Sequence, residues 1–337
     1  MTETTVPATT KTMIAAQQTG YGPAHETIEM RRVPIPEVAP DQVLIEVAAS
    51  TTNALDWHFM TGTPYFLRLQ NGLTTSKRTT PGADVAGTVI AVGTDVAKLA
   101  VGDRVFGEIS EGGFAEYAVA SPDALALAPT SIPLEESATL GVAALTALQG
   151  LRDWAGIRPG DRVLINGGSG GVGTFAIQIA KALGASHVTA VVSTNNVDIA
   201  RSIGADQVID YKTQDFTGLD ETFDVFFDNA GSKSLTQSRR MLTPDGAFVM
   251  VTGQKGRWFR PADRMIGGAL RSKFWSQRWG NGVAKASGAD GEILARMVDD
   301  GLVRPVIDRR FPLTEAVEAL AYQGEGHARG KTLVVVS

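Results

Sequence analysis

The sequence predicts an α/β protein in which a mainly β domain precedes a domain built on a parallel, doubly wound sheet. Three observations support this prediction. A glycine-rich motif at 168–173 stands between an apolar run and a segment of helical periodicity. Apolar runs and helical segments alternate after the motif, as a parallel sheet requires. The first third of the chain instead consists of short strand-like runs separated by turns.

The glycine motif is Gly168-Ser169-Gly170-Gly171-Val172-Gly173, and it follows the apolar run at 163–165. In a strand–turn–helix unit, successive glycines permit a tight turn, a close approach to a pyrophosphate, and close packing of helix on strand. The N–H groups and dipole at the helix N-terminus then favour the negative diphosphate. Glycine clusters also mark ordinary turns, so the alternating elements that follow decide for a Rossmann dinucleotide-binding domain.

The residues after the second strand, 187–192, indicate which dinucleotide binds. An NAD site usually places Asp or Glu about 20 residues past the glycines, where it bonds the ribose 2′-hydroxyl. This chain has Ser193-Thr194-Asn195-Asn196 there. Neutral donors without a carboxylate favour a 2′-phosphate, so we expect NADP(H), with NAD(H) as the alternative. The nearest arginine, Arg201, is interpreted as a surface residue of the next helix.

Composition narrows the class of protein. The chain has 337 residues, long enough for two domains, with 43% hydrophobic and 20% charged residues, as in ordinary globular proteins. The net charge of −5 argues against a nucleic acid or an anionic membrane as partner. The chain has no cysteine, which excludes disulfides, thiolate nucleophiles and cysteine zinc sites. Residues 1–11 lack the features of a signal peptide, so we expect a disordered lead-in and a cytoplasmic protein.

The order of the elements follows from the apolar pattern. Strands are expected at 43–47 and 87–92 in the first domain, and residues 101–107 are expected to form a turn followed by a strand. Apolar residues at helical spacing then predict one helix over 134–154. The second domain continues with strands at 207–210, 223–228 and 247–251, a turn at 243–246, and helices ending at 203 and spanning 233–242. A helix at 292–300 and a final strand at 332–336 follow further along the chain.

The stretch 254–291 alternates aromatic and basic residues. Such a pattern is compatible with a nucleic-acid surface, because aromatics stack on bases and arginines meet phosphates. We favour aromatic packing at a domain or subunit interface. The residues concerned are Trp258, Phe259, Phe274, Trp275 and Trp279, with Arg257, Arg260, Arg264, Arg271, Lys273 and Arg278.

Several blocks together resemble one protein family. The chain is similar to the zinc-independent quinone oxidoreductases, the zeta-crystallin-like branch of the medium-chain dehydrogenase/reductase superfamily. The matching blocks lie in the family's order and cover nearly the whole chain. They are Asn53-Ala54-Leu55-Asp56-Trp57, Pro81-Gly82-Ala83-Asp84-Val85-Ala86-Gly87, 101–107, Gly113-Phe114-Ala115-Glu116-Tyr117, 144–148, the glycine motif, and Gly330-Lys331.

The resemblance implies a catalytic domain with an irregular β-barrel like that of the chaperonin GroES, joined to the Rossmann domain. We expect the catalytic domain to span residues 1–136 and to be completed by 290–337, with the Rossmann domain at 137–289. The resemblance also implies a homodimer and an active site between the two domains.

The resemblance further implies that no catalytic zinc is bound. Zinc-binding members of the superfamily supply a cysteine and a Gly-His-Glu segment, whereas this chain has Gly82-Ala83-Asp84 and no cysteine. The four histidines, 25, 58, 187 and 327, are widely scattered in the sequence. We therefore expect neither zinc nor another metal.

Without a metal, reduction of an acceptor is easier than oxidation of an alcohol, which needs a base to remove the hydroxyl proton. None of the five tyrosines has a lysine four residues on, so the Tyr-x-x-x-Lys arrangement is also absent. A quinone or conjugated enone accepts hydride into an electron-poor π-system, and hydrogen-bond donors stabilise the charge on oxygen. The sequence thus favours an acceptor reductase.

The resemblance assigns roles to individual residues. It places Asn53 and Asp56 beside the nicotinamide, where Asn53 orients the substrate oxygen and Asp56 fixes a donor or relays a proton. A structural turn carboxylate is the alternative for Asp56. Trp57, His58 and Tyr65 are expected in the substrate pocket.

The cofactor contacts are expected along the Rossmann domain. Thr146 would bond the nicotinamide carboxamide, or else its own helix backbone. Tyr211 matches a family tyrosine near the 2′-phosphate, whereas Val197 replaces a phosphate-binding lysine of some relatives. The expected cofactor-binding residues are Thr146, Gly168, Ser169, Gly170, Gly171, Val172, Gly173, Ser193, Thr194, Tyr211, Thr252 and Lys331. For Lys331 the alternative is a solvated surface lysine.

One loop departs from the family pattern. Residues 61–80 are longer than expected, and loops of this length near a cleft often serve function. We expect a partial lid over the acceptor pocket, with a plain surface excursion as the alternative.

We therefore predict an NADPH-dependent reductase of quinones or α,β-unsaturated carbonyl compounds that acts without metal or flavin. Its partner is a small-molecule acceptor, not a nucleic acid or a membrane. A zinc-free alcohol or ketone dehydrogenase is one alternative, and a dinucleotide-binding protein with little catalysis is the other.

Overall fold

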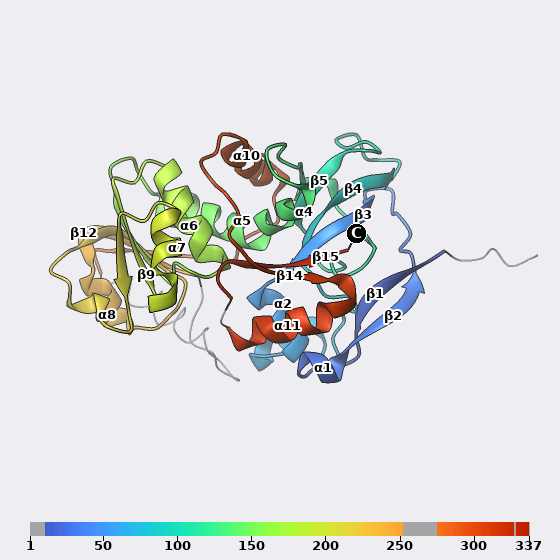
Figure 1. The fold of residues 1–337 in the computed structure, drawn as a ribbon, viewed down its shortest axis with the longest axis horizontal. Coiled ribbons are helices and arrows are strands. Elements are labelled where there is room, and N and C mark those ends of the chain that lie inside the picture. Colours follow the sequence, from blue (N-terminus) through green and yellow to red (C-terminus); the bar gives the residue numbers. More distant parts are fainter. Residues whose placement is uncertain (1–10, 252–274, 327, 337) are drawn as a thin grey trace, which may run out of the picture.

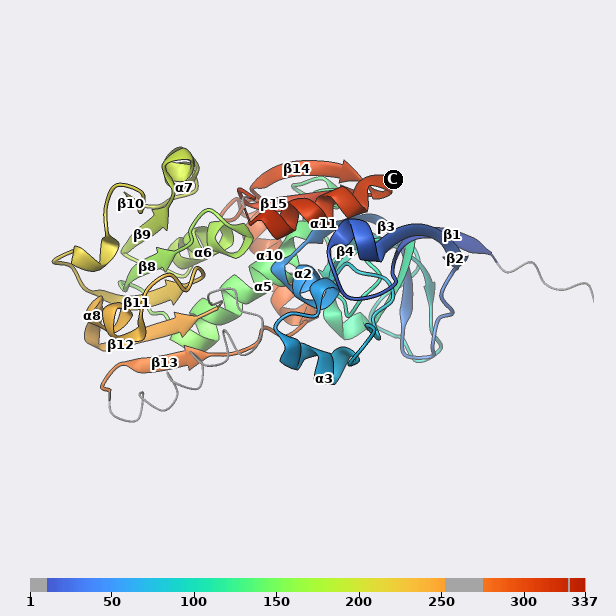
Figure 2. The ribbon, with the colours of Figure 1, turned by 90° about the horizontal axis from the view of Figure 1, so that it is seen from below.

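The computed structural model describes residues 11–251, 275–326 and 328–336, which form two lobes, each built on one sheet (Figure 1). The first sheet has six strands in the order β10-β9-β8-β11-β12-β13, all parallel (Figure 2). Chain order reverses between β8 and β11, where an open α/β sheet binds its ligand. The strands are β8 (Arg162–Asn166), β9 (His187–Val192), β10 (Gln207–Asp210), β11 (Phe223–Asp228), β12 (Leu242–Met250) and β13 (Arg278–Asn281).

The second sheet has seven strands and takes in both ends of the chain. Near the C-terminus, β15 pairs antiparallel with β3, with Val334 opposite Ser50. The strand order is β14-β15-β3-β4-β5-β7, and β6 also pairs with β3. The strands are β3 (Val43–Thr52), β4 (Asp84–Val92), β5 (Arg104–Glu108), β6 (Tyr117–Ala120), β7 (Leu125–Leu127), β14 (Ile307–Pro312) and β15 (Lys331–Val335), with β1 (Thr12–Gln18) and β2 (Ile28–Pro34) as a separate hairpin.

Helices join and cover the two sheets (Figures 1 and 2). In the first lobe they are α6 (Gly171–Ala182), α7 (Val197–Ser202) and α8 (Leu235–Arg240). The others are α1 (Ala24–Thr27), α2 (Ala54–Thr61), α3 (Arg68–Asn71), α4 (Leu134–Ser137), α5 (Val142–Gln149), α10 (Gly288–Asp299) and α11 (Ala316–Glu325). Short 3₁₀ turns lie at Tyr65–Leu67, Pro122–Ala124, Ala138–Leu140, Thr194–Asn196, Phe216–Gly218 and Leu313–Glu315, and a π-helix at Gly150–Ala155.

The single helix expected over 134–154 is wrong, because the segment breaks at Gly141. Gly141 has φ −66° and ψ −119°, and the N–H of Val142 donates to Asp84 Oδ1 at 2.7 Å. A Cβ on Gly141 would lie 2.2 Å from the same oxygen. A tertiary contact with a distant strand therefore interrupts a segment whose local pattern is helical.

Two other expectations change in detail. The turn expected at 243–246 lies inside β12, where the register against β11 shifts and the strand bulges. The loop at 61–80 is not structureless, because it contains the 3₁₀ turn at Tyr65–Leu67 and helix α3. The remaining strands of the Rossmann sheet follow the apolar runs, except β13, which the sequence analysis missed.

The aromatic and basic stretch is described only from residue 275 onwards. Trp279 lies on β13 with its ring 5.0 Å from that of Phe248, and Trp275 packs against the same hydrophobic cluster. These aromatics thus cover the edge of the Rossmann sheet. The expected residues at 252–274, Trp258 and Phe259 among them, lie outside the described residues.

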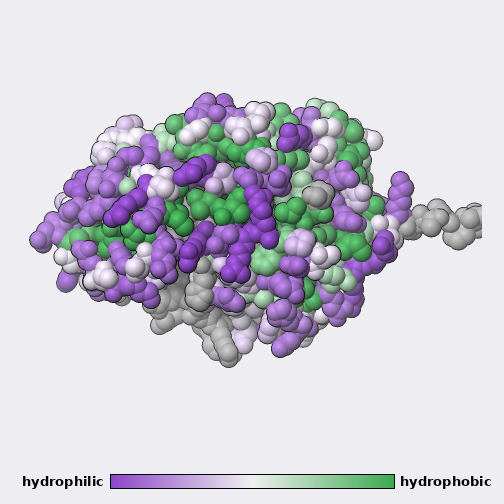
Figure 3. Space-filling view, viewed as in Figure 1, coloured by the Kyte–Doolittle hydropathy of each residue, from purple (hydrophilic) through white to green (hydrophobic). Residues whose placement is uncertain are grey.

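Hydrophilic and hydrophobic residues are interspersed over the face shown in Figure 3, as on most protein surfaces. Within the described ranges, every helix is too short or too polar to cross a bilayer.

Candidate functional site

The glycine motif adopts the geometry that its spacing predicts. Strand β8 ends at Asn166, the turn follows, and α6 begins at Gly171 with Gly170 as its N-cap. A Cβ on Gly173 would lie 2.0 Å from the carbonyl oxygen of Gly167, so only glycine permits the close packing of helix on turn. The first helical turn can therefore present its free N–H groups to a diphosphate.

A cavity of about 650 Å³ lies beside this turn. Tyr211, one of the expected cofactor residues, lines it, together with Lys212 and Lys233, which the sequence analysis missed. Lys212 could have been predicted from the sequence, because it directly follows Tyr211, which was already expected near the 2′-phosphate. Lys233 forms an ion pair of 2.7 Å with Asp215, while Lys212 is exposed and its ammonium lies 5.3 Å from the Tyr211 ring centre.

The other residues expected near the adenosine are hydrogen bonded within the protein. The Thr194 hydroxyl donates to Asp210 Oδ2 at 2.6 Å, and Ser193 Oγ accepts from Asn196 Nδ2 at 3.0 Å. Asp210 also accepts from the N–H of Lys212. The structure therefore brings a carboxylate close to this site from β10, which the sequence around 193–196 did not indicate. Arg201 is exposed near Asp198, as a surface helix residue.

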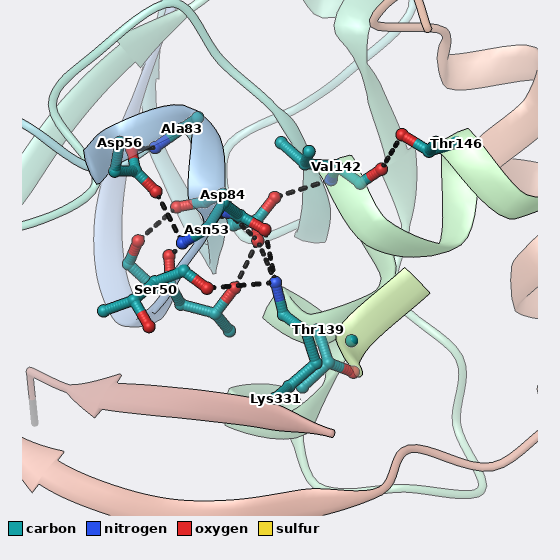
Figure 4. Close-up of polar contacts among 12 residues, drawn as sticks. Ser50, Asn53, Asp56, Ala83, Asp84, Thr139, Val142, Thr146 and Lys331 are labelled. Carbon is teal, nitrogen blue, oxygen red and sulfur yellow. Dashed lines mark hydrogen bonds and ion pairs between the residues drawn. The ribbon is translucent and has the colours of Figure 1, made fainter. Parts of the chain in front are cut away.

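A buried polar network lies where β15 meets α2 and β4 (Figure 4). Its centre is the Lys331 ammonium, which donates to Asn53 Oδ1 at 2.6 Å and to Asp84 Oδ2 at 3.1 Å. A third contact, of 3.4 Å, reaches the carbonyl oxygen of Thr52. Lys331 is 2% exposed and Asp84 is fully buried, so the two charges depend on each other.

Asp84 accepts hydrogen bonds from several elements. Asn53 Nδ2 donates to Oδ2 at 2.8 Å, the Thr51 hydroxyl donates to the same oxygen, and the N–H of Val142 donates to Oδ1. The carboxylate thereby ties α2, β3 and the start of α5 to β15. In the sequence, Asp84 stands at the glutamate position of the Gly-His-Glu segment that zinc-binding members of the superfamily have.

Asp56 closes the first turn of α2. Its Oδ2 accepts from the N–H of Asn53 at 2.8 Å and its Oδ1 from the N–H of Ala83 at 3.1 Å. Burial, with repulsion from Asp84 second, raises the pKa of Asp56 to about 6, although the bonds with Asn53 and the charge of Lys331 oppose the rise. These contacts match the structural role left open as the alternative for Asp56, and proton relay stays a prediction.

Asn53 is fully engaged by the network. Lysine only donates, so Asn53 turns its oxygen to Lys331 and its amide nitrogen to Asp84. Nδ2 has two hydrogens, and it lies 2.8 Å from Asp84 Oδ2 and 3.4 Å from the carbonyl oxygen of Thr51, so binding a substrate oxygen through Nδ2 would require giving up one of these contacts. The geometry supports a positioning role for Asn53.

The network touches the cofactor motif through the residue before Lys331. The N–H of Gly330 donates to the carbonyl oxygen of Ser169 at 2.9 Å. A Cβ on Gly171 would lie 2.9 Å from Lys331 Cδ, so the lysine stem runs directly over the start of α6. The expected role of Lys331 in cofactor binding stays a prediction, while its ammonium points to Asn53 and Asp84.

The remaining candidates are placed as follows. The Thr146 hydroxyl donates to the carbonyl oxygen of Val142 at 2.6 Å, the backbone contact left as its alternative. Trp57 packs beside Gly324 of α11, and its ring lies edge-on to His58, whose Nδ1 is 2.6 Å from the carbonyl oxygen of Thr63. Thr252 lies outside the described residues.

The 61–80 segment is anchored by stacked side chains. The Arg68 guanidinium lies between the rings of Tyr21 and Tyr65, 4.4 and 4.7 Å from their centres. Arg78, further along, lies 3.7 Å from the ring centre of Phe59 on α2. Tyr65 thus contacts the segment itself, and the lid function stays a prediction.

The donor set of this site does not suit zinc. The chain has no cysteine, Ala83 has no donor, and Asp84 is occupied by Lys331 and Asn53. Across 11–251, 275–326 and 328–336, three or more His, Cys, Asp or Glu side chains do not gather in a metal-binding arrangement. No step of the chemistry is therefore assigned to a metal.

Family models match both parts of the chain. The model described as alcohol dehydrogenase GroES-like domain matches residues 39–130, and the model described as zinc-binding dehydrogenase matches residues 203–334. Together with the two sheets, these matches confirm the predicted fold class, a GroES-like irregular barrel joined to a Rossmann domain.

Individual relatives are similar over nearly the full chain. A chloroplastic quinone oxidoreductase from Triphysaria versicolor is 33% identical and covers 96% of this chain and 98% of its own length. A 2-methylene-furan-3-one reductase from Solanum lycopersicum is 32% identical and covers 96% of this chain and 79% of its own. The solved structure of a quinone oxidoreductase from Coxiella burnetii is 32% identical, covers 97% of this chain and all of its own, and has a TM-score of 0.84.

Proposed function

The chain belongs to the quinone oxidoreductase branch of the medium-chain dehydrogenase/reductase superfamily and is an NAD(P)H-dependent oxidoreductase; from this premise we propose that it reduces quinones or α,β-unsaturated carbonyl compounds with NADPH and without a metal. The observation that carries the metal-free mechanism is the Lys331–Asp84 ion pair. Asp84 is paired with the Lys331 ammonium, so its carboxylate is not available as a metal ligand, which supports this mechanism.

The residues present fit a dinucleotide. The glycine turn and the N-terminus of α6 would hold the diphosphate, and the cavity lined by Tyr211 and Lys212 would receive the adenosine end. An exposed lysine beside Tyr211 is suited to a 2′-phosphate, which supports NADPH over NADH. Asp210 opposes this preference by its charge, and its hydrogen bonds with Thr194 and Lys212 N–H reduce that effect.

The bound dihydronicotinamide supplies a hydride, which suits an electron-poor acceptor and needs no base on the protein. In this mechanism Lys331 and Asp84 hold Asn53, and Asp56 holds the first turn of α2. These side chains keep the wall of the site rigid, as preorganised catalysis requires.

The test is NADPH oxidation compared with NADH oxidation, with a quinone, a conjugated enone and a saturated ketone in parallel and a chelator present. The proposal predicts turnover of the quinone or the enone, preference for NADPH, and indifference to the chelator. Turnover of the saturated ketone would favour the alcohol or ketone dehydrogenase. Tight cofactor binding without any turnover would favour a non-catalytic dinucleotide-binding protein.

A homodimer and a cytoplasmic location are also proposed. Light scattering on the purified chain would contradict the dimer if it gave the mass of one chain. Fractionation of cells that express the native gene tests the location, and recovery in a membrane or organelle fraction would contradict it.

A further inference from the structure

Arg78 lies beside the network with its hydrogen-bonding capacity unused. Its guanidinium stacks 3.7 Å from the ring centre of Phe59, yet it forms neither an ion pair nor a side-chain hydrogen bond with any described residue. Partial burial lowers its pKa, while the charges of Asp56, Glu111 and Glu108 act against this fall, and an arginine stays cationic. A half-buried guanidinium whose donors meet no side chain of the described residues is suited to an oxygen ligand.

Glu108 has a carboxyl group that could donate a proton to the same oxygen ligand. It ends β5 directly opposite Asp84 in the β4–β5 ladder, and its Oε2 is buried without a hydrogen-bond partner among the residues that the structure describes. Burial, followed by the charges of Asp84 and Asp56, raises the pKa of Glu108 to about 7, and Arg78 and Lys331 oppose this rise. A carboxyl group in this state can hold a proton near neutral pH and release it.

Backbone contacts bring the two residues to the same place. The segment from Arg78 to Ala83 passes over the face of α2 that carries Asp56 and Phe59, because Ala83 bonds Asp56 and Arg78 covers Phe59. The N–H of Ile109, next to Glu108, donates to the carbonyl oxygen of Ala83 at 2.7 Å.

The other charges around this place are already paired. Glu111 accepts from the N–H of Thr79 at 2.7 Å, Asp84 is paired with Lys331, and Asp56 accepts two backbone N–H groups. The contact of Ile109 with Ala83 and the pairing of Glu108 with Asp84 bring Glu108 to the segment that Arg78 begins, and the charge of Arg78 lowers the pKa of Glu108. Among the described residues the two side chains form no ion pair with one another. An oxygen atom between them would satisfy both.

We propose that Arg78 and Glu108 bind the carbonyl oxygen of the acceptor from two sides, with Arg78 stabilising the negative charge and Glu108 donating the proton. This proposal rests on the proposed reductase function and names its proton source. It also defines the acceptor class as one with an oxygen conjugated to the carbon that accepts hydride, as in enones and quinones.

The electrons and protons balance as follows. A bound dihydronicotinamide would lose a hydride by cleavage of one of its C–H bonds and would be oxidised by two electrons. A C–H bond forms at the β-carbon of the acceptor, and the π electrons move through the conjugated system to give an oxyanion. The guanidinium of Arg78 stabilises this charge. The O–H bond of Glu108 breaks and an O–H bond forms on the acceptor to give an enol. The enol tautomerises to the saturated carbonyl compound or, when the acceptor is a quinone, to the hydroquinone, and water returns a proton to Glu108.

The first test measures turnover with the acceptor that the wild-type enzyme reduces. We expect Arg78→Gln to lower kcat about 100-fold, as for loss of one oxyanion donor, and Arg78→Lys to restore part of it through its charge. Glu108→Gln should lower kcat about 100-fold. It should also remove the loss of activity that the wild type shows as pH rises through about 7, because only the protonated carboxyl donates. A matched control is Arg309→Gln, because Arg309 also stacks on a ring, 4.1 Å from Tyr322, away from this site.

The second test does not depend on turnover. A nitrophenol whose ionisation is visible by absorbance mimics the oxyanion, and its binding is titrated in the presence of NADP⁺. We expect the wild type to bind the phenolate form, Arg78→Gln to weaken binding at least tenfold, and Arg309→Gln to leave it unchanged.

The outcomes separate the two proposals. Turnover of enones or quinones that both variants retain, with a pH profile like that of the wild type, would overturn the roles of Arg78 and Glu108 and leave the reductase standing. Silence of the wild type toward every acceptor would overturn the reductase. In that case phenolate binding decides: loss in Arg78→Gln supports the oxygen site, and unchanged binding overturns it.

Discussion

Replacing Lys331 by methionine tests how much the buried Lys331–Asp84 ion pair contributes to the free energy of unfolding. Methionine keeps a stem of similar length and removes the ammonium. Asp84 would then be a fully buried carboxylate without its cation. Breaking a buried ion pair by removing one partner costs about 3–5 kcal/mol. Asp84 keeps its donors from Asn53, Thr51 and Val142, so we expect the lower end, about 3 kcal/mol.

The assay is urea unfolding followed by circular dichroism, with the midpoint and slope compared between variants. Lys181→Met is the matched control, because Lys181 pairs with Asp206 at a similar 3.0 Å but both side chains are about one third exposed. An exposed pair contributes at most about 1 kcal/mol. The double variant Lys331→Met/Asp84→Asn removes both charges and should be more stable than Lys331→Met alone.

Two results would refute this reasoning. One is a cost for Lys331→Met that does not exceed that of Lys181→Met. The other is a double variant no more stable than Lys331→Met, since the cost would then not arise from an unpaired carboxylate. Either result would mean that the network is hydrated or rearranges freely.

Three further predictions concern the cofactor and the carboxyl groups. Gly173→Ala should weaken NADPH binding more than tenfold by calorimetry, because the new Cβ would lie 2.0 Å from Gly167 O; Gly218→Ala, with no atom within 4 Å, should bind as the wild type does. Lys212→Glu should raise the Kd for NADPH relative to NADH about tenfold, or about 1.4 kcal/mol, and an unchanged ratio would exclude Lys212 from the 2′-phosphate site. The folded pKa of Glu108 lies above its ordinary value of 4.5, at about 7, so its contribution to stability is present below pH 4.5 and lost as pH rises through 7. Glu108→Gln should therefore be more stable than the wild type at about pH 8 and gain nothing at about pH 4; equal differences at both pH values would contradict the shift.

The Rossmann domain could be predicted from the sequence because the residues that identify it lie close together in the chain. The turn at Gly168 to Gly173, the strand before it and the helix after it lie within about one βαβ unit. Each further strand or helix could be recognised from the periodicity of its own apolar residues. The resemblance then supplied Asn53, Asp56 and the second lobe. The loss of zinc ligands at Ala83 could likewise be read directly from residue types.

The sequence could not show which side chains pair across the fold. Lys331 and Asp84 are 247 residues apart, and Lys331 and Asn53 are 278 apart. No periodicity or spacing relates such positions, so the contacts of Asn53 and Lys331 could be found only in the folded structure. The break at Gly141 has the same origin, because Asp84 on a distant strand outweighs the local helical pattern.

The sequence by itself determined the cofactor class, the strand–turn–helix motif and the absence of cysteine chemistry. Only the tertiary structure decided that Asn53 and Asp56 are held by internal hydrogen bonds, and that the Arg78 guanidinium and Glu108 Oε2 have no hydrogen-bond partner among the described residues. The physical reason is that composition and periodicity report on a residue's own neighbours in the chain. Whether a buried charge is paired or free depends on groups that folding brings to it from elsewhere.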